Sequence, residues 1–187
     1  MGKRESVKKP KLPRDYYPTV DVDAVGALIP FLYSPEGPTR YVEPCAGAGS
    51  LIDLLHSRAA PVACVGAYDI EPQSAYITQR NCLTLGAKDV EGVDCFITNP
   101  PFSWVLLQPI LDHLPTLKPT WLLLPADSMH NKRMSPYIDF CKHIVSVGRL
   151  WWFENEGGKK VKGVDNFCFY EFDHNHTGPT IFHSRLM

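Results

Sequence analysis

The sequence predicts an α/β protein with a mostly parallel β-sheet, helices on both faces and an antiparallel hairpin at the C-terminal edge. Two observations support this fold class. From about residue 40 to residue 124, short apolar runs alternate with segments of helical periodicity, as in parallel strands joined by crossover helices. After residue 144, two long strand-like runs are separated by the polar segment 157–163, which lacks a helical pattern. These two runs therefore predict an antiparallel pair.

The predicted helices follow from the spacing of apolar residues. In the first of them, Val22, Val25 and Leu28 recur near helical spacing, and Asp21 is a suitable N-cap. Comparable patterns, the last with Pro109 inside it, predict helices at 20–33, 51–58, 74–79 and 104–114.

The predicted strands are short runs of apolar and β-branched residues bounded by turn residues. Seven such runs predict strands at 40–43, 61–68, 82–85, 93–98, 121–124, 144–154 and 166–173. Strands joined by helices should lie parallel, with only one strand of the C-terminal hairpin reversed.

The length of 187 residues fits one domain. Hydrophobic residues make up 44% of the chain and charged residues 21%, the balance of a globular protein. No apolar run is long enough to span a membrane. We therefore expect a single domain over residues 16–187 that does not act at a membrane.

Basic residues are concentrated at the N-terminus, although the formal net charge of the whole chain is −1. Residues 1–15 are therefore expected to form a basic, flexible arm on an acidic domain. Such an arm either contacts nucleic acid or is simply a solvated terminus.

The six cysteines predict neither disulfides nor a metal site. They form no C-x-x-C pair, and most lie in apolar runs, so we expect buried free thiols of a reducing compartment, the cytoplasm. His174 and His176 stand in a polar turn and are expected to be solvated. These patterns together predict a protein without a bound metal.

A glycine-rich loop, EPCAGAG at 43–49, follows the first predicted strand and leads into a helix. Gly47 and Gly49 allow tight turns and close approach of a ligand, and a helix N-terminus favours polar ligand atoms. The loop lacks a third glycine and a phosphate-binding lysine, which favours a phosphate-poor nucleoside. Asp69, at the end of the second strand, could accept hydrogen bonds from a ribose. Alternatively, Asp69 and Glu71 provide charge at a helix N-terminus.

The turn Asn99-Pro100-Pro101-Phe102 follows a buried strand, where open parallel sheets bind ligands. The Asn99 side-chain oxygen and the Pro100 carbonyl are two acceptors, and Phe102 offers a flat apolar face. Together they suit a planar group that carries an amino group. The alternative is a tight turn with a buried Phe.

EPCAGAG together with NPPF resembles the class I S-adenosylmethionine-dependent methyltransferases that modify exocyclic amines. The resemblance covers about residues 17–173 and is closest to the DNA adenine-N6 methyltransferases, including small phage-type members. It implies a seven-stranded Rossmann-like sheet, S-adenosylmethionine as cofactor and S-adenosylhomocysteine as product, without a metal. Related motifs occur in enzymes that methylate DNA, RNA or protein glutamine. RNA and protein glutamine therefore stay open as substrates, and so does a non-catalytic accessory role.

The resemblance also implies a cofactor site. Asp69 would hold the ribose, and Ile70 would lie along the adenine. Asn81 would contact the edge of the adenine, with Asp89 as the alternative candidate. Tyr17, Pro18 and Thr19 would line the methionine end. The matching glycine-loop residues are Glu43, Cys45, Ala46, Gly47 and Gly49.

For the substrate, the resemblance implies that Asn99 and Pro100 accept hydrogen bonds from the target amine and that the base stacks on Phe102. Phe167 or Phe169 would cover the other face of the base, unless it belongs to the core. We expect no separate target-recognition domain, because no segment of these residues is long enough to form one. The lysines at 159, 160 and 162 either contact phosphates or form a solvated hairpin tip. These features predict a nucleic acid partner, DNA before RNA, in a prokaryotic or phage-infected cell, and leave a helper subunit or a homodimer open.

Overall fold

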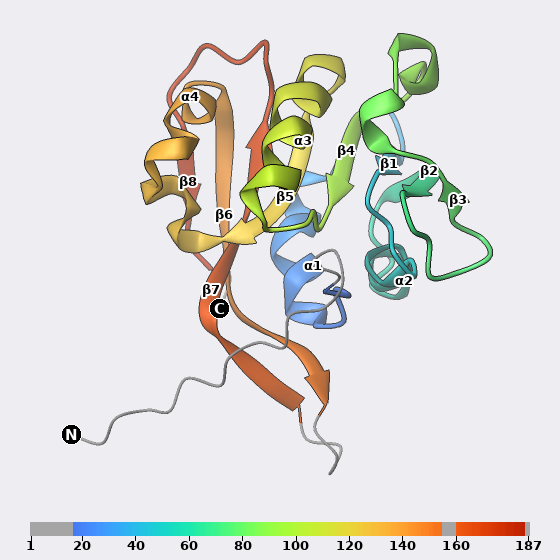
Figure 1. The fold of residues 1–187 in the computed structure, drawn as a ribbon, viewed down its shortest axis with the longest axis horizontal. Coiled ribbons are helices and arrows are strands. Elements are labelled where there is room, and N and C mark those ends of the chain that lie inside the picture. The colour runs from blue at the N-terminus through green and yellow to red at the C-terminus, as the bar shows by residue number, and fades with distance from the viewer. Residues whose placement is uncertain (1–16, 155–159, 186–187) are drawn as a thin grey trace.

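The strands form one mixed sheet of eight strands, in the order β3-β2-β1-β4-β5-β7-β6-β8 (Figure 1). This computed structural model describes residues 17–154 and 160–185. The predicted basic arm and Lys159 lie outside these residues. The strands are β1 (Thr39–Glu43), β2 (Val62–Asp69), β3 (Thr78–Gln79), β4 (Cys95–Thr98), β5 (Thr120–Pro125), β6 (Cys141–Glu154), β7 (Lys160–Phe172) and β8 (Ile181–His183).

The direction of the strands confirms the predicted fold class. β1 pairs in parallel with β2 and β4, and β4 pairs in parallel with β5. β7 is antiparallel to both β5 and β6, and β8 is parallel to β6. β6 and β7 are therefore the predicted antiparallel pair, and β7 is the strand that runs in the reversed direction. No helix of the described residues is long and apolar enough to cross a bilayer.

Helices cover both faces of the sheet. α1 (Val22–Leu28) and α2 (Ser50–Ser57) pack on one face, and α3 (Trp104–Leu117) and the short α4 (Ser135–Ile138) pack on the other. The Asp21 side chain accepts a hydrogen bond of 3.1 Å from the Asp23 N–H, which confirms the predicted N-cap. α3 tolerates two internal prolines and buries its apolar stripe against the sheet.

The segment between β2 and β4 differs from the prediction. The helix predicted at 74–79 is wrong, because these residues form turns and then the two-residue strand β3. The strand predicted at 82–85 is also wrong, because Cys82–Thr84 is a 3₁₀ helix capped by the Asn81 side chain, which accepts from the Leu83 N–H at 3.0 Å. A side-chain cap of this kind competes locally with an extended backbone.

Two further differences concern the C-terminal part and the thiols. An eighth strand, β8, adds to the edge at β6, and its three residues are too few for a recognisable period. The expected burial holds for four of the six cysteines, whereas Cys64 is exposed and Cys45 is half-buried.

The outer parts of β6 and β7 form a ribbon that projects away from the sheet (Figure 1).

Candidate active site

A cavity of about 620 Å³ opens at the carboxyl ends of β1, β2 and β4. These strands are neighbours in the sheet, with β1 between the other two, so the glycine loop, Asp69 and the NPPF turn meet there. The wall also includes residues that we did not predict as site residues, two of them in the glycine loop: Pro44, Ala48, Ser50, Leu51, Gln73, Cys82, Leu83, Leu106 and Ile110. Leu106 and Ile110 are four apart on α3, a spacing that could have identified them.

The glycine loop has the backbone that its sequence requires. Gly47 and Gly49 have φ angles of 55° and 87°, in the left-handed region that favours glycine. A Cβ at Gly49 would collide with the ring of Tyr76, whose hydroxyl donates a hydrogen bond of 2.9 Å to the Ala48 carbonyl. Gly49 ends the loop at the N-terminus of α2, although it is not itself part of the cavity wall.

Asp69 connects β2 to the glycine loop. Its Oδ2 accepts a hydrogen bond of 2.7 Å from the Gly47 N–H, and its Oδ1 accepts one of 2.8 Å from the Glu71 N–H. Residues 70–77, directly after Asp69, form bends and turns and no helix, so the alternative of a charge at a helix N-terminus is wrong. The carboxylate shapes the loop and also forms part of the cavity wall.

Three polar atoms in this cavity are buried and have no hydrogen-bond partner among the described residues. They are Thr19 Oγ1, Glu43 Oε2 and Asn99 Oδ1. Buried polar atoms are nearly always paired, so three such atoms in one cavity indicate a polar ligand with donor groups. Burial, followed by the nearby Asp69 and Asp53 carboxylates, raises the pKa of Glu43 well above its usual value.

The charges of the cavity wall are all acidic. Glu43, Asp69 and Glu71 lie on it, and none of its described residues is Lys, Arg or His. A phosphate-bearing ligand would be repelled here, whereas a ligand with positive charge would be attracted. The wall therefore agrees with the phosphate-poor ligand expected from the loop sequence.

Replacing Glu43 with glutamine is expected to raise Tm by several degrees at pH 8 in the ligand-free protein, because it removes a buried charge. A carboxyl with a raised pKa in the folded state stabilises that state below its unfolded pKa, and loses this contribution as pH rises through the folded pKa. The difference in Tm between the Glu43→Gln variant and the wild type should therefore shrink as the pH falls toward 4.5. Thermal unfolding between pH 5 and pH 8 measures this, with the exposed Glu36→Gln as a control that leaves Tm unchanged.

The NPPF turn presents one amide oxygen to the cavity. The Asn99 Nδ2 donates a hydrogen bond of 2.7 Å to the Tyr17 backbone carbonyl, which fixes the side-chain amide so that Nδ2 is occupied and Oδ1 stays an unpaired acceptor. Pro101 lines the cavity, whereas Pro100 is buried and is not part of the cavity wall. Asn99, directly after β4, is thereby positioned by Tyr17, a residue that precedes α1.

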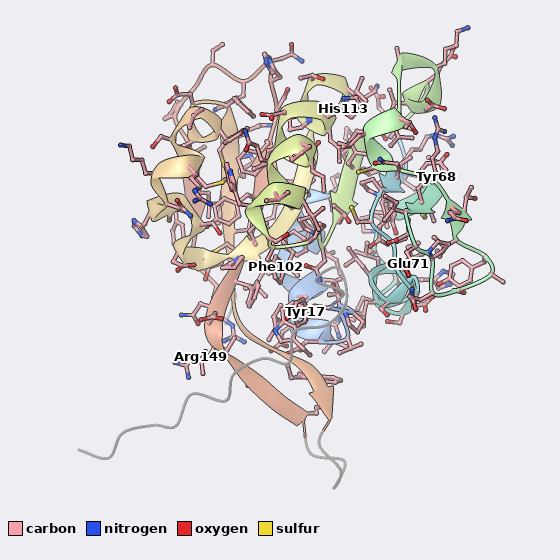
Figure 2. All side chains as sticks on the ribbon, in the orientation of Figure 1. Tyr17, Tyr68, Glu71, Phe102, His113 and Arg149 are labelled. Carbon is pink, nitrogen blue, oxygen red and sulfur yellow. The ribbon has the colours of Figure 1, made fainter. Side chains whose placement is uncertain are left out.

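Phe102 is half-buried and lies outside the cavity wall. Its ring stacks on Tyr17, with the centroids 5.8 Å apart and the planes 16° apart, and it also contacts Trp152 and Phe167. Figure 2 shows Tyr17 and Phe102 beside each other. Stacking of a base on Phe102 therefore stays a prediction.

Phe167 and Phe169, the two candidates for the other face of a target base, lie in the core. Both are fully buried in the core on the α1 side of the sheet, whereas the alternate residues Cys168 and Tyr170 of β7 pack on the α3 side. Lys160 and Lys162 are exposed on the projecting ribbon, and the Lys160 Nζ lies 4.4 Å from the centroid of the Trp151 ring.

The structure separates the two candidates for the adenine edge. Asn81 lies on the cavity wall. Asp89 does not, and its carboxylate accepts two hydrogen bonds of 2.8 Å from Arg80. The predicted Tyr17, Pro18, Thr19, Cys45, Ala46 and Ile70 also line the cavity.

Solved structures resemble the chain, although no family model and no curated protein matches it. A Listeria monocytogenes protein described as a class I S-adenosylmethionine-dependent methyltransferase gives a TM-score of 0.59 at 9% identity, over 95% of this chain and 68% of its own. A Pyrococcus horikoshii protein described as an RNA methyltransferase gives a TM-score of 0.50 at 13% identity, over 92% of each chain. The chain therefore shares the fold of these two proteins.

Proposed function

We propose that the chain is an S-adenosylmethionine-dependent methyltransferase that modifies the exocyclic N6 amine of adenine in DNA. The observation that carries this proposal is the unpaired Asn99 Oδ1, buried in the same cavity as the glycine loop. An acceptor with no protein donor suits an amine that arrives with the substrate. The fold shared with a protein described as a class I methyltransferase supports the same chemistry.

The residues present fit the cofactor. S-adenosylmethionine carries a sulfonium and an ammonium group, so an acidic wall without basic side chains favours it. Asp69 and Glu71 would accept hydrogen bonds from the ribose, and the unpaired Thr19 and Glu43 atoms would accept them from the methionine end. Ile70 and Asn81 would contact the adenine. When bound, the cofactor supplies a methyl group on a positively charged sulfur.

The chemistry required of the protein is mainly positioning. Asn99 Oδ1 and the Pro100 carbonyl would accept the two hydrogens of the target amine, which holds its lone pair toward the methyl donor. The same two oxygens would stabilise the positive charge that develops on nitrogen. An adenine in a duplex would first have to leave the base stack.

The projecting ribbon supports nucleic acid as the partner. Arg149, Lys160 and Lys162 are exposed on it, and Trp152 joins the base of the ribbon to Phe102. Exposed cations on a ribbon that contacts the NPPF turn through Trp152 would suit the phosphates that flank a target nucleotide.

The double variant Lys160→Glu/Lys162→Glu is expected to weaken DNA binding and to reduce the slope of log K against log salt by about 1 per lysine. Fluorescence anisotropy at several salt concentrations measures both effects. Lys88→Glu, an exposed lysine away from the cavity and the ribbon, is the matched control. An unchanged salt slope in the double variant would contradict the placement of the phosphates.

The proposed function is tested by methyl transfer from labelled S-adenosylmethionine to unmethylated duplex DNA, single-stranded DNA, RNA and a protein extract. Digestion and mass analysis identify the product. N6-methyladenine from DNA is the expected result. Label in RNA or in glutamine would replace the substrate and keep the amine chemistry. Cofactor binding without transfer to any of these would favour an accessory role.

A further inference from the structure

The loop that follows β5, residues 126–134, carries two exposed cations beside the NPPF turn. These are Lys132 and Arg133. The Arg133 Cζ atom lies over the ring of Trp104, 5.8 Å from its centroid. Trp104 is the first residue of α3 and comes two positions after Phe102 in the chain. The loop therefore reaches the proposed catalytic turn from the side of the sheet that α3 covers.

Hydrogen bonds and burial fix the backbone of this loop near both of its ends. At its start, the Tyr170 hydroxyl donates a hydrogen bond of 3.0 Å to the Ala126 carbonyl. Near its end, the Asn131 side-chain oxygen accepts one of 3.1 Å from the Arg133 N–H, and the next residue, Met134, is buried in the core. Because the backbone is fixed before a ligand arrives, binding through these cations costs little additional ordering.

The Arg133 guanidinium is oriented by Trp104 but is not neutralised. Among the described residues, no carboxylate lies within ion-pair distance of Arg133 or Lys132, whereas Arg80 and Arg185 each pair with an aspartate. A guanidinium held over an aromatic ring keeps its in-plane N–H groups for an acceptor that takes two hydrogen bonds, such as a phosphate. This pair of cations is therefore available to an anionic ligand.

The NPPF turn lies between this loop and the projecting ribbon. Phe102 packs against both apolar clusters of the core, one with Trp104 on the α3 side and the other with Trp152 on the α1 side. The ribbon projects from the end of the sheet at which β5 leads into the loop, since Pro125 pairs with Phe167 (Figure 1). A polyanion that crosses the turn would therefore meet cations on both sides of it.

We propose that Lys132 and Arg133 bind phosphates of the DNA substrate on the α3 side of the NPPF turn, opposite the cations of the ribbon. This inference rests on the proposed function, which supplies DNA as the partner. The loop contains one acidic residue, Asp127, so it does not repel a polyanion strongly. Contacts to phosphates position a strand without reading its bases. The two surfaces together would hold the DNA on both sides of the target adenine.

The test compares DNA binding by the full chain and by the double variant Lys132→Ala/Arg133→Ala. Fluorescence anisotropy with a labelled duplex at several salt concentrations gives Kd and the slope of log K against log salt. We expect Kd to rise about 10-fold and the slope to fall by about 2 in magnitude, one for each lost contact. Arg133→Lys should keep the wild-type slope and bind more weakly, because it retains the charge and loses the bidentate geometry.

Arg58→Ala is the matched control. Arg58 is an exposed arginine at the C-terminal end of α2, outside the cavity wall, and it forms no ion pair among the described residues. This variant should leave Kd and the slope unchanged. Thermal unfolding of each variant verifies that it is folded at the temperature of the binding experiment.

An unchanged Kd and slope in the double variant would overturn the proposal, and so would an equal loss in the Arg58→Ala control. Weaker binding of RNA by the double variant, with unchanged binding of DNA, would overturn DNA as the partner of this surface. Methyl transfer separates this inference from the proposed function. DNA binding that depends on Lys132 and Arg133, without formation of N6-methyladenine, would support the surface and count against the proposed function. Formation of N6-methyladenine by the double variant with the wild-type KM for DNA would count against the surface alone.

Discussion

Replacing Asn99 with alanine is expected to lower kcat for methyl transfer to DNA by about 10²–10³-fold, the effect typical of losing one preorganised polar group at a reacting centre. The reason is the Oδ1 atom, a buried acceptor that no described residue satisfies and that the Tyr17 carbonyl holds in one orientation. Because this acceptor acts on the amine, the Kd for S-adenosylmethionine should stay near that of the wild type. Single-turnover kinetics and calorimetry separate the two quantities.

Two variants sharpen the Asn99 experiment. Asn99→Asp keeps an acceptor but loses the donor to the Tyr17 carbonyl, so it should retain more activity than alanine and less than the wild type. Asn175→Ala removes an exposed side chain in the loop before β8 and should leave kcat unchanged. An Asn99→Ala protein with wild-type turnover would show that the target amine is held elsewhere.

Replacing Asp69 with alanine is expected to weaken S-adenosylmethionine binding by about 10²-fold, because two charge-assisted hydrogen bonds are lost together. The carboxylate accepts from the N–H groups of Gly47 and Glu71, so its removal also takes away one of the hydrogen bonds that connect the glycine loop to β2. The loss should appear in Kd before it appears in kcat at saturating cofactor. Calorimetry measures the first and steady-state kinetics the second.

A matched control for Asp69 exists at the opposite end of the sheet. The Asp94 carboxylate accepts a hydrogen bond of 2.7 Å from the Arg40 N–H but lies outside the cavity wall. Asp94→Ala should therefore cost some stability without changing cofactor affinity. If both variants lowered affinity to the same degree, the effect of Asp69 would be one of general stability, and its assignment to the ligand would be wrong.

Much of the site could be predicted because its parts are local. Gly47 and Gly49 mark a backbone that other residues adopt only with strain, and the prolines of NPPF mark a rigid turn. Each motif follows a strand of recognisable pattern. In a parallel sheet the carboxyl ends of neighbouring strands meet at one edge, so local motifs predict one joint site.

The rest could not be predicted because it depends on contacts between distant residues. Residues 74–85 have weak patterns of their own, and their structure follows from the Asn81 cap and from the contact of Tyr76 with the glycine loop. The pattern of an alternating strand does not show which of its faces other elements cover. Burial of Phe167 and Phe169 in the core could therefore be predicted only as an alternative to a place beside the target base.

The sequence by itself determined the fold class, the places of the main strands along the chain, and the positions of the glycine loop, Asp69 and the NPPF turn. These follow from local periodicity and backbone restriction. The tertiary structure alone decided how the side chains of these segments are oriented and which of them line the cavity. It placed the Tyr17 carbonyl against the Asn99 amide, and it excluded Asp89 from the cavity wall, where Asp89 instead forms an ion pair with Arg80. Such contacts bring together residues far apart in the chain, and no local pattern encodes the distance between them.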